Sequence, residues 1–305
     1  MRSLLERVGR GKGKRGKRGW HPAPFIVGVS RSGTTLLRLM LDAHPDLAIP
    51  PETHFIPNAV RASANSKDPH RDFLEAVVTD NPRWKDYRID ANHLRERIDG
   101  VRPFDTGEAI RVFYETYVER FDKPRWGDKT PAYCRSMQLI SRVLPEARFV
   151  HLIRDGRDVA LSTMRAQMGP QTVEKWAERW KLLIERAREA AESLGEAYME
   201  VRYENLISSP ELVLKDLCAF VDLPWDTTML RYQDRAAERV EEINQDLPRR
   251  TGKQRVAAHA LTSHPPQKSR VAAWKTEMTR EQVVSFEKVA GAMLTELGYE
   301  RMTRR

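Results

Sequence analysis

One glycine-containing segment near the N-terminus carries the spacing of a phosphate-binding loop. An apolar run, FIVGV, meets Gly28, and Gly33 follows five positions later at the start of a helix-like pattern. This is the arrangement G-x-x-x-x-G-K-[ST], whose backbone amides and helix N-terminus surround a phosphate. The position of the usual lysine holds Thr34, followed by Thr35, and the nearest cation is Arg31 inside the loop. A strand-to-helix connection that binds nothing is the alternative interpretation.

The missing lysine changes which ligand the loop suits. In loops that hydrolyse ATP or GTP, the lysine bridges the β- and γ-phosphates and a hydroxyl holds Mg²⁺. The hydroxyls, amides and helix N-terminus left here favour one phosphate with a transferred group beside it. They suit a metal-bound triphosphate poorly, and no metal site is predicted.

A second segment, VHLIRDGRDVALS, offers another anion site. Arg154 ends a predicted strand, at the edge where open parallel sheets bind ligands. Asp158, Ser162 and Arg165 follow on one face of a predicted helix. Because arginine is permanently charged and bidentate toward phosphate, Arg154 and Ser162 are candidates to hold a second phosphate. A salt-bridge network around the turn is the alternative. Two phosphate sites without a metal site indicate an adenosine 3′,5′-bisphosphate.

Strands and helices alternate along most of the chain. Apolar runs predict strands at residues 24–29, 46–50, 147–153 and within 197–206, and helices at residues 34–44, 172–194, 209–223 and 279–298. A Ser-Pro pair opens the third of these helices and a Thr-x-x-Gln box opens the last. This order predicts an α/β fold: a P-loop-like, doubly wound, mostly parallel sheet flanked by helices.

Two regions interrupt the alternation. Residues 55–122 contain several short amphipathic patterns, which predict a helical cap inserted over the sheet edge. Residues 234–270 are polar and rich in Arg and Lys, and are predicted to be irregular. Trp176 and Trp180 fall on one stripe of the long helix, which favours a core position over a stacking platform. Residues 22–305 are expected to form a single domain.

The composition narrows the class of protein. The 305 residues carry a formal net charge of +9, which suggests an anionic partner. Residues 1–21 form a basic, glycine-punctuated run that predicts a disordered tail with weak contacts to a membrane surface or nucleic acid. Cys134 and Cys218 are too few and too far apart for a disulfide framework or a metal site. No membrane helix or secretory signal is predicted, so a cytoplasmic protein is expected.

The motifs, in this order, resemble the sulfotransferases that use 3′-phosphoadenosine 5′-phosphosulfate (PAPS). Their 5′-phosphosulfate loop, [P/S]-[K/R]-S-G-T-T, is matched by SRSGTT from Ser30 to Thr35, with Ser32 inside it. Their 3′-phosphate motif is matched by Arg154 and Ser162. The resemblance runs from about residue 24 to residue 223. The stretch after Arg31 looks most like the tyrosylprotein sulfotransferases and their bacterial relatives, and it implies PAPS as the sulfuryl donor without a metal.

The resemblance also assigns the chemistry. It makes Glu52, after the second strand, the base that takes the proton of the acceptor hydroxyl, and Arg31 and Lys129 the cations that stabilise the leaving bisphosphate. An ordinary glutamate is a weak base, so a cap that desolvates Glu52 would help. The alternatives are an exposed loop acid at Glu52 and a structural pair between Asp128 and Lys129.

Three further contacts to the nucleotide follow from the resemblance. Tyr203, in VRYENL, matches a residue that contacts the nucleotide. Arg270 and Lys275, in KSRVAAWK, resemble a basic segment that closes over the 5′-phosphate, and solvated surface charge is the alternative for this stretch.

The acceptor is expected to be a hydroxylated small molecule, lipid or sugar, selected by the cap at residues 55–122. Tyrosylprotein sulfotransferases carry arginines two and six residues after the catalytic glutamate, where this chain has His54 and Asn58. They also have a membrane anchor and disulfides, which this sequence does not show. A peptide tyrosine is the alternative acceptor.

Two other functions compete with this interpretation. A P-loop kinase with a degenerate loop would need Mg²⁺ and an acidic residue at a strand end, and no clear candidate is present. A nucleic-acid-binding module would use the basic tail and show steeply salt-dependent affinity. The core contains no recognisable nucleic-acid motif.

Overall fold

The computed structural model describes residues 20–166, 172–248 and 250–302. Its main sheet has four parallel strands in the order β4-β1-β5-β6. These strands are β1 (Ala23–Gly28), β4 (Asp128–Lys129), β5 (Ala147–Ile153) and β6 (Tyr198–Arg202). The predicted strand at residues 46–50 is shorter and lies elsewhere: β2 (Leu47–Ala48) pairs with β3 (Arg125–Trp126) in a separate two-stranded sheet. The prediction of a mostly parallel sheet flanked by helices is confirmed.

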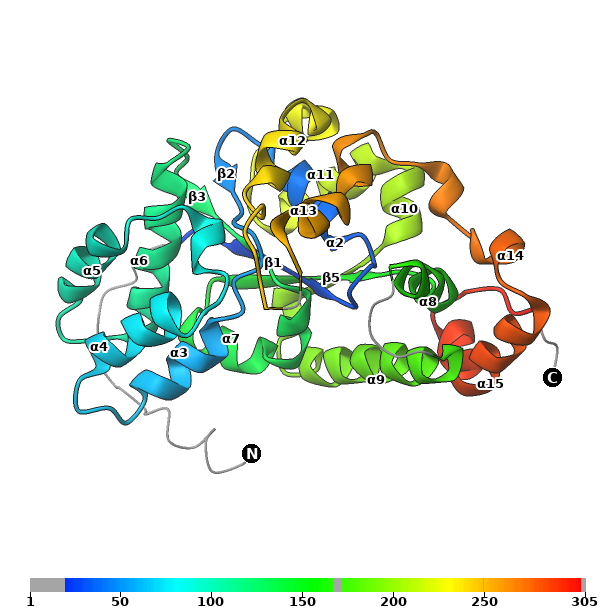
Figure 1. The fold of residues 1–305 in the computed structure, drawn as a ribbon, viewed down its shortest axis with the longest axis horizontal. Coiled ribbons are helices and arrows are strands. Elements are labelled where there is room, and N and C mark those ends of the chain that lie inside the picture. Colours follow the sequence, from blue (N-terminus) through cyan, green and yellow to red (C-terminus); the bar gives the residue numbers. More distant parts are fainter. Residues whose placement is uncertain (1–19, 167–171, 249, 303–305) are drawn as a thin grey trace.

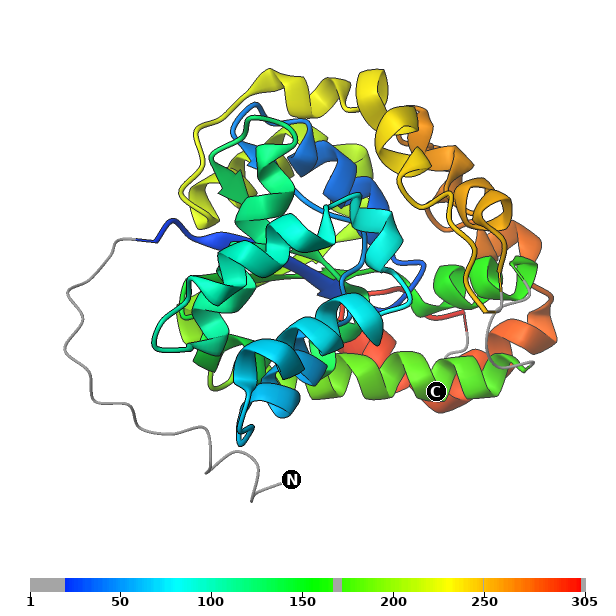
Figure 2. The ribbon, with the colours of Figure 1, turned by 60° about the vertical axis from the view of Figure 1, so that its left-hand side comes forward.

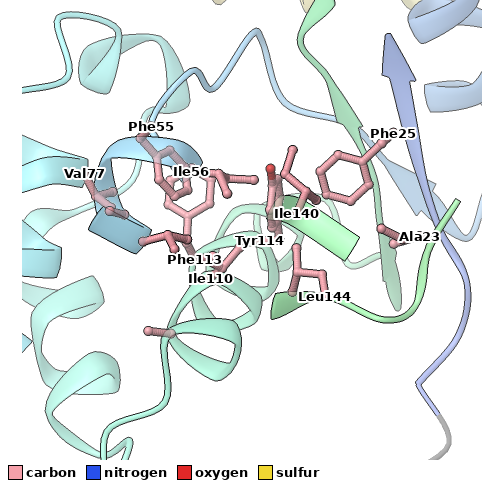
Figure 3. Packing of buried hydrophobic residues seen from close by; sticks show 14 of the residues in the cluster. Ala23, Phe25, Phe55, Ile56, Val77, Ile110, Phe113, Tyr114, Ile140 and Leu144 are labelled. Carbon is pink, nitrogen blue, oxygen red and sulfur yellow. The ribbon is translucent and has the colours of Figure 1, made fainter. Parts of the chain in front are cut away.

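Helices cover both faces of the main sheet, with α7 and α9 on one side and α2 and α11 on the other (Figure 1). The alternation of side chains along β1 explains the two layers: Phe25 and Val27 enter one core and Ile26 enters the other. On the first face, Phe25 meets Tyr114 edge to face at 6.4 Å between ring centroids (Figure 3). A strand that is buried on both faces needs an unbroken apolar run, which is what the sequence supplies.

Residues 55–122 fold into short helices, as predicted. They comprise α3 (Ile56–Ser63), α4 (Pro69–Leu74), a π-helical turn (Glu75–Thr79), a 3₁₀ turn (Trp84–Tyr87), α5 (Ala91–Asp99) and α6 (Thr106–Glu119). A 3₁₀ turn (Pro131–Arg135) and α7 (Met137–Val143) follow β4. Phe55 and Phe113, whose ring centroids are 4.6 Å apart, belong to the same core cluster as Phe25 of β1 (Figure 3). The insertion is therefore part of the main hydrophobic core.

The remaining helices build the other layers. They are α2 (Thr34–Asp42), α8 (Gly156–Arg165), α9 (Val173–Ala191), α10 (Tyr203–Ser208), α11 (Pro210–Phe220) and α15 (Arg280–Glu296). Short 3₁₀ turns lie at Gly195–Ala197 and Thr227–Arg231. Trp176 and Trp180 are buried against α15, so their predicted core position is confirmed. Thr279 and Gln282 form the predicted capping box, whereas Ser209 precedes α11 without a side-chain capping bond.

The prediction of an irregular segment at residues 234–270 is wrong. This segment contains α12 (Gln233–Glu241), α13 (Gly252–Ala257) and 3₁₀ turns at Ala260–Ser263 and Lys268–Arg270, and α14 (Trp274–Glu277) follows. We call residues 240–273 the cover segment; in yellow and orange, it lies on the side toward which the β1 arrow points (Figure 2). Ala236 and Val240 of α12 pack in the core that includes α2, and the buried Arg239 contacts Asp42 of α2 at 2.7 Å.

Cys134 and Cys218 are buried free thiols. Among the described residues, no helix is both long and apolar enough to cross a bilayer. Almost all of the basic tail at residues 1–21 lies outside the described residues, so its disorder and its weak contacts with membranes stay predictions. The cytoplasmic location also stays a prediction.

Candidate active site

A cavity of about 690 Å³ opens at the carboxyl edge of the main sheet. Each strand brings one predicted residue to its wall: Arg31 after β1, Lys129 at the end of β4, Arg154 after β5 and Tyr203 after β6. The other predicted residues in the wall are Gly33, Thr34, Thr35, Glu52, Ser162 and Arg270. Open parallel sheets bind ligands at this edge, so the fold brings the two predicted phosphate motifs to the expected place.

The loop after β1 is shaped by backbone that few side chains tolerate. Arg31 and Gly33 have φ angles of 72° and 96°, and Gly33 caps α2. A Cβ on Gly33 would lie 2.5 Å from Cδ2 of Tyr203, so the tyrosine ring covers the loop closely. Ser32 is fully buried, and its hydroxyl oxygen has no hydrogen-bond partner among the described residues. Ser32 is not itself in the cavity wall, but it lies between the wall residues Arg31 and Gly33; because buried hydroxyls are normally paired, its free oxygen suits an anion bound in the loop.

Arg154 joins the loop to the cover segment. Its Nη1 donates to the carbonyl oxygen of Arg31 at 3.1 Å, and its Nη2 donates to that of Arg270 at 2.6 Å. The guanidinium lies over the ring of Tyr203 at 4.4 Å, and its buried Nε has no partner among the described residues. Arg31 Nε in turn donates to the hydroxyl of Ser162 at 3.1 Å. The two predicted phosphate sites therefore adjoin each other through Arg31 and Ser162.

The alternative of an Asp–Arg network around the turn is also present in the structure. Asp158 lies 3.7 Å from Arg154, but its closer bonds come from the backbone amides of Ala272 at 3.0 Å and Trp274 at 2.9 Å. Burial raises the pKa of Asp158 to about 6. Asp158 thus anchors the chain that follows Arg270, while Arg154 and Ser162 face the cavity.

Glu52 lies in the cavity wall with 23% of its side chain exposed, so it is not a freely solvated loop acid. Its Oε1 accepts from Lys129 at 2.9 Å, and its Oε2 lies 2.9 Å from His54 Nε2 and 3.4 Å from Arg83. Burial disfavours the charge, but Lys129, His54 and Arg83 outweigh it and hold the pKa of Glu52 well below its usual range. The expectation that desolvation would make Glu52 a stronger base does not hold for this arrangement.

Lys129 pairs with Glu52, and not with the neighbouring Asp128 as the structural alternative supposed. The ammonium also donates to Thr35 Oγ1 at 3.3 Å, which places it beside the loop. Burial lowers the pKa of Lys129, and Glu52 partly offsets this shift. Asp128 points away, into the core, where its Oδ2 accepts from Thr53 at 2.7 Å and from Tyr114 at 2.9 Å.

Several wall residues near Glu52 and Lys129 were given no role from the sequence. His54 and Arg83 contact Glu52, and Arg38 and His259 complete the wall near Lys129. Burial, together with Lys129, lowers the pKa of His259 to about 3. Arg83 and His259 belong to segments distant in sequence, so only the fold brings them together. Arg38 could have been predicted, because it lies one helical turn after Thr34 on α2 and therefore on the same face as the loop residue.

The cover segment encloses the cavity, a role that the sequence had suggested for the helical insertion. Of residues 55–122, Arg83 alone is in the wall, whereas the cover segment contributes residues from Val240 to Ala273. The expectation that the insertion selects the acceptor is therefore poorly supported by the geometry. Lys275 is not in the wall: its ammonium lies 3.0 Å from Glu300, and the side chain is 51% exposed.

The cations outnumber the acids in the wall. Its charged residues are Arg31, Arg38, Arg83, Lys129, Arg154, Arg165, Arg179, Arg250, Arg255 and Arg270 against Glu52 and Asp158. No group of three or more His, Cys, Asp and Glu side chains that could hold a metal ion occurs in the described part of the chain. Arg38, Arg165 and Arg255 already pair with Glu242, Glu277 and Asp86, which lie outside the wall, and the excess of the other seven cations suits a ligand with several negative charges.

Comparisons with known proteins agree with this geometry. Residues 22–227 match the family described as "Sulfotransferase family". Protein-tyrosine sulfotransferase A of Caenorhabditis elegans is 30% identical over 224 residues, which are 70% of this chain and 53% of the relative. Protein-tyrosine sulfotransferase 1 of Homo sapiens is 28% identical over 225 residues, which are 70% of this chain and 54% of the relative. The chain spans about half the length of these curated relatives.

Two solved structures share the fold. The sulfotransferase domain of the curacin biosynthetic pathway superimposes with a TM-score of 0.58 at 20% identity, over 92% of this chain and 99% of that domain. The sulfotransferase domain of the Synechococcus PCC 7002 olefin synthase gives a TM-score of 0.55 at 19% identity, over 94% and 98% of the two chains. At these identities the likeness concerns the fold alone.

Proposed function

The chain belongs to the sulfotransferase family, and from that membership we propose that it transfers the sulfuryl group of PAPS to an acceptor hydroxyl. One observation carries the proposal: Lys129 Nζ lies 2.9 Å from Glu52 and 3.3 Å from Thr35, at the N-terminus of the helix after the loop. A candidate base, a candidate leaving-group cation and an anion site thus meet at one point.

The residues present fit the donor. The buried, unpaired Ser32 hydroxyl and the N-terminus of α2 suit the 5′-phosphosulfate, with Gly33, Thr34 and Thr35 beside it. Arg154 and Ser162 suit the 3′-phosphate, with Arg31 between the two sites. Tyr203 and Arg270 complete the contacts, whereas Lys275 is not included. PAPS supplies an activated sulfuryl group.

The protein's part in the reaction is to move one proton and to stabilise charge. A bond forms between the acceptor oxygen and sulfur, and the bond between sulfur and the bridging phosphate oxygen breaks. Glu52 takes the acceptor proton, and Lys129 and Arg31 stabilise the charge on the departing adenosine 3′,5′-bisphosphate.

The low pKa of Glu52 has a place in this scheme. Lys129 contacts both Glu52 and Thr35, so an anion in the loop competes with Glu52 for the ammonium. When the ammonium turns to the anion, Oε1 of Glu52 loses its closest cation and the carboxylate becomes more basic. Base strength and donor binding are coupled in this way.

For the acceptor, we propose the phenolic hydroxyl of a peptide tyrosine. The curated relatives are protein-tyrosine sulfotransferases, which favours this acceptor over the small molecule, lipid or sugar expected from the sequence. Arg83 flanks Glu52 with a positive charge that an acidic peptide would match. A small hydroxylated molecule is the second candidate, because His54 and Asn58 stand where the tyrosylprotein enzymes have arginines.

Calorimetry without metal tests the donor. We expect adenosine 3′,5′-bisphosphate to bind much more tightly than ADP to the wild type, and Arg154→Ala to lose that preference while Arg61→Ala, on the exposed side of α3, keeps it. Equal affinities for adenosine 3′,5′-bisphosphate and ADP, or binding only with Mg²⁺ and ATP, would favour a P-loop kinase over a sulfotransferase. Binding to nucleic acid with an affinity that falls steeply as salt rises would favour the nucleic-acid-binding module.

Mass spectrometry with PAPS tests the acceptor. Acidic tyrosine peptides, simple phenols, alcohols and sugars are offered separately at equal concentration. Sulfation of tyrosine in the peptide supports the proposal. Faster transfer to a small acceptor would establish the second candidate, and no transfer to any acceptor by a protein that binds the bisphosphate would leave the proposed reaction without support.

A further inference from the structure

The backbone next to Glu52 is strained. His54 has a φ angle of 57°, and the amide of Phe55 donates to the carbonyl oxygen of Thr53 at 2.7 Å. Together these form a three-residue γ-turn of the rare positive-φ kind. The turn directs the His54 ring back to Glu52, whose Oε2 lies 2.9 Å from Nε2. Strain of this kind persists where the surrounding structure holds the turn firmly.

The hydroxyl of Thr53 is the centre of what holds it. This hydroxyl donates to Asp128 Oδ2 at 2.7 Å, and since its single proton is used there, Tyr133 is the donor in the 2.8 Å bond between the two hydroxyls. The amide of Thr53 donates to Thr130 Oγ1 at 2.9 Å. All four side chains are almost completely excluded from solvent.

The helical insertion supplies the rest of the cluster. Asn81 and Tyr87 donate to the carbonyl oxygen of Thr53 at 3.1 and 2.9 Å, and Tyr114 donates to Asp128 at 2.9 Å. The side chains of Asn81, Tyr87 and Tyr114 are themselves buried. Every polar group of Thr53 is therefore bonded, and the partners come from β4, the turn after it and the insertion.

The cluster lies directly behind the reacting groups. Thr53 follows Glu52 in the chain, and Asp128 precedes Lys129. Because neighbouring side chains of extended backbone point to opposite sides, Thr53 and Asp128 meet in the core while Glu52 and Lys129 meet in the cavity. The 2.7 Å bond on one side and the 2.9 Å ion pair on the other link the same two backbone segments.

We propose that Thr53 and Asp128 are positioning residues, and that the insertion serves to hold Glu52 and His54 in register with Lys129. The inference rests on the proposed function, because it assigns the cluster to the proton-transfer geometry of that reaction. Arg154 and Ser162, which are proposed to hold the donor, make no contact with the cluster, so the cluster should act on turnover more than on affinity for the bisphosphate.

The variant Thr53→Val tests this, because it keeps the shape and removes the hydroxyl. We expect kcat to fall about 10- to 100-fold, as for a displacement of about 1 Å at a reacting group. The affinity for adenosine 3′,5′-bisphosphate should change far less than kcat, because Arg154 and Ser162 make no contact with Thr53. Thr53→Ser, which keeps the hydroxyl, should recover most of the turnover.

Thr116→Val is the matched control. Thr116, in α6 of the insertion, is also buried, but its hydroxyl donates to the carbonyl oxygen of Val112 at 2.6 Å and accepts from Arg97 at 3.0 Å, and it is not in the cavity wall. It should lose stability without losing turnover. The NMR signals of the His54 ring, assigned with His54→Gln, should shift in Thr53→Val and stay in place in Thr116→Val.

The outcomes separate the two hypotheses. A wild type that binds no bisphosphate or transfers no sulfuryl group contradicts the proposed function. A wild type that does both, with Thr53→Val equal to Thr116→Val in kcat and in the His54 signals, overturns the positioning role alone. If Thr53→Val does not fold, the comparison of Thr53→Ser with the wild type by the same ring signals decides: unchanged signals support the role, and displaced signals contradict it.

Discussion

Lys129 Nζ lies 2.9 Å from Glu52 Oε1, so the proposed leaving-group cation and the proposed base neutralise each other before any ligand binds. The proposed proton acceptor and the proposed cation for the leaving group thus form an ion pair with each other. The free energy of that pair must be given up when Lys129 turns to the donor. This relationship gives the two residues opposite effects on donor affinity.

Glu52→Gln should bind adenosine 3′,5′-bisphosphate more tightly than the wild type while losing turnover, because Lys129 no longer has to leave a carboxylate. Lys129→Met should weaken binding and lower kcat by about 100- to 1,000-fold, the loss seen for one transition-state donor. Calorimetry and initial rates measure the two effects. Lys215→Met, at an exposed pair with Glu211, is the control. Weaker bisphosphate binding in Glu52→Gln would show that the ion pair does not compete with the donor.

The pH dependence of kcat/KM follows from the same contacts. Cations hold the pKa of Glu52 well below its usual range, so the acid limb of the profile should lie below the ordinary glutamate value. Arg83→Gln removes one of these cations, which makes the carboxylate easier to protonate and moves the acid limb upward. Arg61→Gln on α3 is the control. Unchanged limbs in Arg83→Gln would mean that a group other than Glu52 limits the reaction in acid.

The loop after β1 and the position of Arg154 could be predicted, because each is determined by residues close together in the sequence. Gly28 and Gly33 mark the backbone that a tight strand-to-helix turn requires, and the apolar run before them marks a strand buried on both faces. Arg154 follows a similar run, and the parallel sheet then brings both to one edge. The short, periodic helices of the insertion were likewise visible in the sequence.

The structure of α12 and the positions of Arg83 and Lys275 depend on contacts between distant segments, which a local sequence pattern does not contain. The buried apolar positions of α12 are few, Ala236 and Val240, and Arg239 and Glu242 stabilise the segment by ion pairs with α2 that only the folded chain creates. Arg83 reaches Glu52 from the insertion across a long separation in sequence. Lys275 looked like part of a basic ligand-binding segment, but Glu300 was available as its partner.

The stability of the protein should depend on the ionisation of Asp128. Burial raises the pKa of Asp128 from 3.8 to about 6, so the folded state binds its proton more tightly than the unfolded state does. The resulting stability is complete below the unfolded pKa and is lost as pH rises through about 6. Two pKa units correspond to about 3 kcal/mol.

Urea unfolding of the wild type and Asp128→Asn across this pH range measures the effect. The difference in unfolding free energy between the two proteins should change by up to about 3 kcal/mol, with the wild type losing stability relative to the variant as pH rises. Burial also raises the pKa of Asp158 to about 6. Because Asp158 is present in both proteins, its contribution cancels in the difference between their unfolding free energies. Parallel stability curves would show that Asp128 has no raised pKa in the folded state.

The close fit of Tyr203 over the loop makes Gly33 sensitive to a single methyl group. Gly33 has a φ of 96°, and a Cβ there would lie 2.5 Å from the tyrosine ring, so Gly33→Ala should destabilise the protein and displace the loop from the donor. Gly195→Ala is the matched control: its φ is also positive, at 52°, and a Cβ there would have no neighbour within 4 Å.

Gly195→Ala should therefore cost only the backbone strain, about 1 kcal/mol, and leave bisphosphate affinity unchanged. Adding Tyr203→Ala to both the wild type and Gly33→Ala separates the two causes, because it removes the clash and keeps the positive φ, while the cost of losing the buried tyrosine is common to both backgrounds. We expect Gly33→Ala to cost less stability in the Tyr203→Ala background than in the wild type, measured by thermal unfolding, and the double variant to bind the bisphosphate weakly, since Arg154 loses the ring on which it lies. An equal cost in the two backgrounds would show that the backbone conformation, and not the tyrosine, requires glycine at this position.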